Sequence, residues 1–116
     1  MSAYTFDLNT AGEADVVVAA LAGELDLTNA RELEERLERA APPEVLLVID
    51  VSQVVFIDSA ALHVFFKLAR RRGPDALAVA MDPDAPIARA VEIVGLGNAT
   101  RIVRTVADAH PLATAD

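Results

Sequence analysis

The segment Glu44–Val51 constrains the fold of this chain more than any other, because its apolar residues follow one another without polar alternation. A strand with one buried face alternates apolar and polar residues, whereas a strand covered on both faces has no place for polar ones. The uninterrupted run Val45–Ile49 is far shorter than the roughly 20 residues needed to span a bilayer. It therefore predicts a central strand with parallel neighbours.

Strands are predicted on both sides of this segment. Before it, Ala3–Leu8 and Asp15–Ala22 carry apolar or β-branched residues and are separated by a turn at Gly12–Glu13, which predicts a hairpin. After it, further strands are expected at Ala76–Ala80 and Arg101–Val106.

Apolar residues recur at helical spacing in three segments. The first helix covers residues 30–41, and Asn29 with Glu32 resembles a capping box at its start. The second covers residues 59–72. The third begins with Pro86 at its first position, where the missing N–H of proline does no harm.

The resulting order ββαβαβαβ predicts an α/β fold. Strands that alternate with helices form parallel βαβ units, so a mixed sheet of about five strands with parallel central strands is expected. Three to four helices cover it, the fourth being a single turn at residues 107–109. One domain with its core at residues 4–109 is expected, and residues 111–116 are predicted to form a loose tail.

Composition excludes several classes of function. The net charge of −8 disfavours nucleic acids and anionic membranes, because binding to them requires a basic surface. The absence of cysteine excludes cysteine catalysis and thiolate metal sites. With neither a signal peptide nor a membrane span in the sequence, a cytoplasmic protein is expected, with no direct contact to nucleic acid and no membrane insertion.

The sequence offers no catalytic set. Its two histidines, His63 and His110, have no partners at metal-ligand spacing, so neither a metal nor a cofactor is expected. Asp58, Ser59 and His63 lie too close together along one helix turn to form a catalytic triad with the usual orienting geometry. The chain is therefore predicted to be a binding module and not an enzyme.

One short segment stands out, because a buried strand ends at Asp50 and Asp58–Ser59 then open an apolar helix. Ser52–Ile57 between them is interpreted as a short connection. Asp and Ser are also preferred N-caps, since their oxygens accept hydrogen bonds from free backbone N–H groups. Capping alone therefore accounts for these two residues as well as a binding role does.

The chain resembles the STAS domain, and in particular the bacterial anti-sigma factor antagonists. The resemblance rests on Gly23-Glu24-Leu25-Asp26, the strand end at Asp50, Phe56-Ile57-Asp58-Ser59, and the late segment Ile87–Leu96. It spans roughly residues 4–109. Each motif is weak alone, but their order and spacing together are specific.

The resemblance implies that Ser59 is phosphorylated by a kinase that is itself the anti-sigma factor. The unmodified protein binds this kinase and frees a sigma factor, phosphorylation ends the binding, and a serine phosphatase resets the cycle. The resemblance assigns the partner surface to six residues: Asp26, Asp58, Ser59, Ala60, Ala61 and His63.

The sequence departs from the family pattern at two of these positions. Ala61 stands where the family usually has glycine, which favours the helix by about 0.8–1.0 kcal/mol. His63 stands where a small or apolar residue is expected.

Two other functions stay open. One is a constitutive STAS scaffold, an accessory subunit of a lipid-transport ATPase or of a stress-sensing assembly, that docks a partner without phosphorylation. The other is a sensor of a nucleotide or small anion at the helix N-terminus.

Overall fold

The computed structural model of the chain describes residues 3–10 and 15–109. Its elements follow the order β1 (Tyr4–Thr10), β2 (Val16–Leu25), α1 (Ala30–Ala40), β3 (Leu46–Ile57), α2 (Ser59–Arg72), β4 (Leu77–Ala80), α3 (Ala88–Ile93) and β5 (Arg101–Val103). Short 3-10 turns at Leu96–Asn98 and Val106–Asp108 flank β5. The predicted turn at residues 12–13 and the predicted tail at residues 111–116 lie outside the described residues.

The five strands form one mixed sheet in the order β1-β2-β3-β4-β5. β1 pairs antiparallel with β2, and the other neighbours are parallel. β3 is central, and its residues 46–49 are buried on both faces. The predicted α/β fold, hairpin and parallel central strands are therefore confirmed.

The interpretation of Ser52–Ile57 as a connection is wrong, because β3 continues through this segment to Ile57. Two register shifts against β2 each place an additional residue in β3. Such bulges break the alternation of a strand, and the buried positions Val51, Val54 and Ile57 consequently lie three residues apart. The sequence pattern gives no sign of a strand here for that reason.

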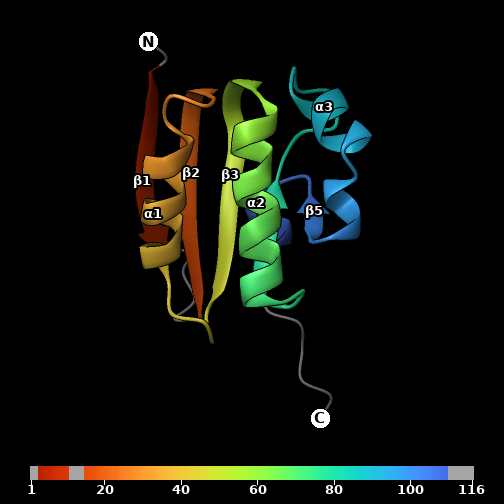
Figure 1. The fold of residues 1–116 in the computed structure, drawn as a ribbon. Coiled ribbons are helices and arrows are strands. Elements are labelled where there is room, and N and C mark those ends of the chain that lie inside the picture. Colours follow the sequence, from red (N-terminus) through yellow and green to blue (C-terminus); the bar gives the residue numbers. More distant parts are fainter. Residues whose placement is uncertain (1–2, 11–14, 110–116) are drawn as a thin grey trace.

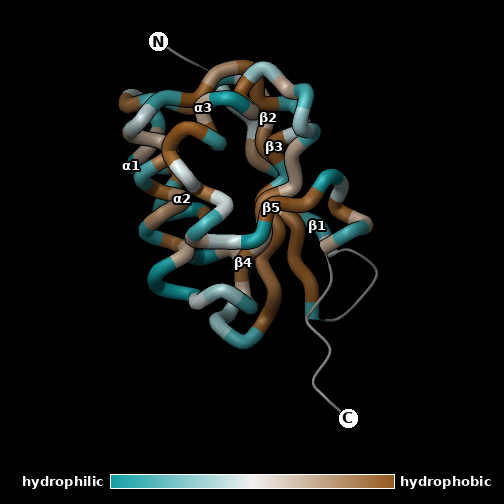
Figure 2. The backbone as a smooth tube through the Cα atoms, turned by 90° about the vertical axis from the view of Figure 1, so that its right-hand side faces the viewer, coloured by the Kyte–Doolittle hydropathy of each residue, from teal (hydrophilic) through white to brown (hydrophobic). Residues whose placement is uncertain are grey.

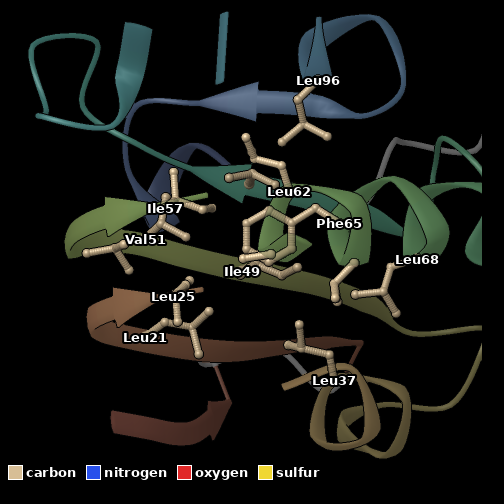
Figure 3. Packing of buried hydrophobic residues seen from close by; sticks show 14 of the residues in the cluster. Leu21, Leu25, Leu37, Ile49, Val51, Ile57, Leu62, Phe65, Leu68 and Leu96 are labelled. Carbon is tan, nitrogen blue, oxygen red and sulfur yellow. The ribbon is translucent and has the colours of Figure 1, made fainter. Parts of the chain in front are cut away.

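The main core lies between the sheet and the helices (Figure 1), where α1 and α2 run side by side over one face. Leu62 and Phe65 project from α2 onto Ile49 and Val51 of β3, and Leu37 of α1 lies over β2 (Figure 3). β2, β3 and β4 are predominantly apolar (Figure 2). A smaller cluster on the other face includes Ala109 of the C-terminal segment.

The edges of three other predicted elements differ in the structure. The third helix begins at Ala88 and not at Pro86, because residues 82–87 form turns closed by bonds such as Ala88 N–H to the Ala85 carbonyl. β5 ends at Val103, and the predicted helical turn starts at Val106. The capping box predicted from Asn29 and Glu32 does not form, because the Asn29 side chain makes no cap hydrogen bond to α1 and accepts the N–H of Asp26 instead.

Arg72 fastens the far end of α2 to the rest of the fold. Its guanidinium donates hydrogen bonds to the carbonyls of Ala41, Pro42 and Val45 in the connection after α1, and to that of Ala76. Arg71 pairs with Glu34 and Glu38 of α1. Two residues of the basic run Arg70–Arg72, Arg71 and Arg72, therefore stabilise the position of α2.

Candidate functional site

Two loops meet at the edge of the sheet where β2 and β3 end. The strands are parallel, and their last residues, Leu25 and Ile57, are register partners. The backbone N–H of Asp58 donates to the Leu25 carbonyl at 3.1 Å. Because the carboxyl ends of parallel strands share one edge, the structure brings Asp26 and Asp58 together there.

The Asp58 carboxylate joins the two loops. Its Oδ1 accepts the N–H of Ala61 at 3.1 Å, and its Oδ2 accepts the N–H of Leu27 at 3.0 Å. Asp58 is therefore the N-cap of α2, and Ser59 is the first helical residue. The sequence allowed either residue to cap the helix. In the structure Asp58 is the cap, and the Ser59 hydroxyl does not cap α2.

Asp26 and Asn29 hold the loop before α1. Asp26 Oδ1 accepts the N–H and the hydroxyl of Thr28 at 2.9 and 2.6 Å. The buried Asn29 amide accepts the N–H of Asp26 at 3.0 Å and donates to the Glu24 carbonyl at 2.9 Å. Asn29 therefore locks the loop instead of forming the expected capping box.

The exposed stripe of α2 runs through Ser59 and His63. Buried residues such as Leu62 and Phe65 occupy the opposite side of the helix, so the Ser59 and His63 side chains are directed to solvent. Together with Phe66, Arg70 and Val94 they line a shallow hollow of about 280 Å³. This hollow is the concave surface next to the Ser59 hydroxyl.

The two alanines after Ser59 differ in position. Ala60 is half-buried and lines a second groove of about 390 Å³ between α1 and α2, which His63 also lines. Ala61 is 0% exposed and belongs to the core. Of the residues assigned to a partner surface, Ala61 thus supports the site from beneath and presents no side chain at the surface.

Exposed apolar side chains flank Ser59. Leu27, whose N–H is bound to Asp58, is 76% exposed. Val94, which lines the hollow with Ser59, is 43% exposed, and Ile93 beside it is 73% exposed. Large apolar groups gathered at the surface are typical of protein–protein contacts. Sequence reasoning missed all three: the helical spacing assigns Val94 to the apolar face of the third helix, and it gives no role to Leu27 or Ile93.

A charged network fixes α2 against α1. Glu34 Oε1 accepts from Lys67 Nζ at 2.6 Å, and Oε2 accepts from Arg71 at 3.3 Å. The hydrogen bond from Lys67 holds the pKa of the Glu34 carboxyl below its ordinary value, and the charges of Arg71 and His63 act in the same direction. His63 and Glu34 also line the same groove between α1 and α2.

The chemistry available at the start of α2 is that of the exposed Ser59 hydroxyl beside charged and apolar groups. Within residues 3–10 and 15–109, no three His, Cys, Asp or Glu side chains gather as a metal site would require. No described helix has the length and apolar content that crossing a membrane requires. His110, the other histidine of the sequence, lies outside the described residues.

Solved structures share this fold. An anti-sigma factor antagonist from Mycobacterium paratuberculosis is 25% identical and superposes with a TM-score of 0.78, over 91% of this chain and 90% of that chain. The phosphorylated form of the Bacillus cell fate determinant SpoIIAA is 20% identical with a TM-score of 0.61, over 90% and 95%. The murine anion transporter Slc26a9 is 12% identical with a TM-score of 0.66, over 94% of this chain but 22% of the transporter.

No curated protein matches the chain. The family model of the STAS domain, in contrast, matches residues 7–109, which is nearly the whole described fold. The resemblance drawn from Gly23–Asp26 and Phe56–Ser59 is thereby confirmed at the level of the family. The chain belongs to the STAS domain family.

Proposed function

We propose that this protein is an anti-sigma factor antagonist, which binds a kinase-type anti-sigma factor and is switched off by phosphorylation of Ser59. The observation that carries the proposal is the placement of Ser59. It is exposed at the first position of α2, Asp58 supplies the cap in its stead, and apolar side chains flank it. A kinase can reach such a hydroxyl without disturbing the fold.

The same placement explains how phosphorylation would end binding. A phosphoserine carries about −1.5 to −2 charges at pH 7, and a helix N-terminus tolerates them. A partner packed on Leu27 and Val94 would have to bury that charge beside Asp58, which costs far more than the contact provides. The modification therefore changes the surface and leaves the core intact.

The solved relatives support the same function. The structure from Mycobacterium paratuberculosis is that of an anti-sigma factor antagonist, and SpoIIAA has been solved in phosphorylated and unphosphorylated forms. By this proposal the protein acts in the cytoplasm as a regulator of transcription. Its partners are the anti-sigma kinase and a serine phosphatase, and it has no catalytic activity of its own.

Incubation with ATP and each purified kinase-type anti-sigma factor of the source organism tests the proposal. We expect one of these kinases to add a single phosphoryl group, located by mass spectrometry at Ser59. Ser52 is a matched control, since it is an exposed serine on β3 and not at a helix start. Ser59→Ala should abolish the modification and Ser52→Ala should not. Modification at Ser52, or of neither serine by any kinase, would refute the proposal.

A constitutive scaffold is the second candidate. The likeness to a domain that makes up 22% of the Slc26a9 chain favours it, because there the fold is one part of a longer protein. In this role the protein would be an accessory subunit of a lipid-transport ATPase or of a stress-sensing assembly. A scaffold would bind its partner equally well with Ser59 phosphorylated or unmodified, whereas an antagonist would not.

A further inference from the structure

We propose that His63 binds the phosphoryl group of phosphorylated Ser59 and holds it over the hollow beside α2. The inference rests on the proposed phosphorylation of Ser59 and adds a residue that binds the phosphorylated side chain. His63 follows Ser59 by four positions on α2, and both side chains line the hollow of about 280 Å³.

Helix geometry directs the imidazole toward Ser59. Side chains at i and i+4 lie on one face with Cβ atoms about 5–6 Å apart. A long helical side chain points back toward the N-terminus and covers the preceding turn. The His63 ring therefore extends toward the turn that contains Ser59, and phosphorylation lengthens the serine side chain to meet it.

Electrostatics on the other side of Ser59 favours the same contact. The Asp58 carboxylate is fixed by hydrogen bonds to the N–H groups of Leu27 and Ala61, so it cannot turn away from a phosphoryl group next to it. Repulsion from this carboxylate drives the phosphoryl group away from the cap and along the helix surface. Of the two basic side chains that line the hollow with Ser59, His63 is the nearer along α2 and Arg70 the farther.

Other charged groups surround His63 and must be distinguished from it. Glu34 of α1 lines the groove between α1 and α2 together with His63. Arg31 of α1 and Lys67 of α2 line the groove on the far side of His63, and Arg70 lines the hollow about three turns from Ser59. Lys67 is held by Glu34 at 2.6 Å, which leaves Arg31 as the cation to be tested beside His63.

The contact would anchor the phosphoryl group in the hollow where a partner would otherwise pack. The site would then be both charged and filled.

Protein with phosphoserine incorporated at position 59 during translation tests this contact without any kinase. The ³¹P resonance of the phosphoryl group is followed from pH 8 to pH 4.5 in wild type, His63→Gln and Arg31→Gln, with circular dichroism confirming that each is folded. A neighbouring imidazolium favours the dianion, so the midpoint in wild type should lie about 0.5 unit below that in His63→Gln. Arg31→Gln should move it less than His63→Gln does.

Equal midpoints in wild type and His63→Gln, or a shift produced by Arg31→Gln alone, would overturn the inference. Because phosphoserine is incorporated during translation, either result can be told apart from a failure of the proposed function, which is tested by phosphorylation with an anti-sigma kinase and by binding to it. A phosphorylated protein that still binds its partner would refute the switch even if His63 holds the phosphoryl group.

Discussion

Replacement of Asp58 should destabilise the protein far more than replacement of Ser59, although both residues belong to the same motif. Asp58→Ala removes the cap of α2, which is worth about 1 kcal/mol, and the bond to the Leu27 N–H, worth about 0.5–1.5 kcal/mol. The sum is about 2 kcal/mol. Asp58→Asn keeps one carbonyl-type oxygen and should lose about half of this. Ser59→Ala removes an exposed hydroxyl and should cost less than about 0.5 kcal/mol.

Urea unfolding at pH 7, followed by far-ultraviolet circular dichroism, measures these differences. With a slope of about 1.3 kcal/mol per molar urea, Asp58→Ala should lower the midpoint by about 1.5 M. Hydrogen exchange of the Leu27 amide should accelerate in the same variant, because its acceptor is lost. A midpoint within 0.3 M of wild type for Asp58→Ala, or an equal loss for Ser59→Ala, would refute the assignment of the cap.

Three further predictions concern the rest of the fold. Arg72→Lys should lower the free energy of unfolding by about 1–3 kcal/mol in urea, because a lysine cannot bind four carbonyls, whereas Arg70→Lys should have no effect beyond about 0.5 kcal/mol. Gly23→Ala should lower the thermal midpoint by several degrees, since Gly23 has a φ of +94° and a Cβ would lie 2.5 Å from a backbone oxygen; an unchanged midpoint would contradict that geometry. Burial, aided by the hydrogen bond to Glu32, raises the pKa of Tyr4 to about 12, so this contribution to stability is complete below pH 10 and is lost as the pH rises through about 12. Because Tyr4 is the single tyrosine, absorbance at about 295 nm reports its ionisation, and Glu32→Gln should move the midpoint toward 10.

Much of the fold was predictable because its signals are local and periodic. The apolar run at Val45–Ile49 indicated a doubly covered strand, and the 3.6-residue period indicated α1 and α2. The extension of β3 through Ser52–Ile57 was not predictable, since its two bulges replace the alternation of a strand with a three-residue spacing. The short α3 began later than Pro86 indicated, because turn hydrogen bonds compete with the helix there.

The residues of the candidate site were predictable from the sequence, but the hydrogen bonds that each of them makes were not. The pair Asp58–Ser59 indicated a helix start, yet only the structure shows that Asp58 reaches across to Leu27. Asn29 had the spacing of a cap, but its side-chain oxygen accepts the N–H of Asp26, and its Nδ2 donates to the Glu24 carbonyl. The apolar flanks at Leu27 and Val94 come from segments distant in sequence, so no local pattern joins them to Ser59.

Whether Ser59 is a phosphorylation switch can be decided by calorimetry, which measures the affinity of the protein for its anti-sigma kinase before and after phosphorylation. We expect the unmodified protein and Ser59→Ala to bind with similar affinity. Phosphorylation should weaken binding at least about 100-fold, which corresponds to a loss of about 2.7 kcal/mol in binding free energy. Burial of an unpaired charge costs more than this. Ser59→Asp should lie between the two, since it carries less charge than phosphoserine. If the phosphorylated protein binds as tightly as the unmodified one, Ser59 is not a switch and the account is wrong.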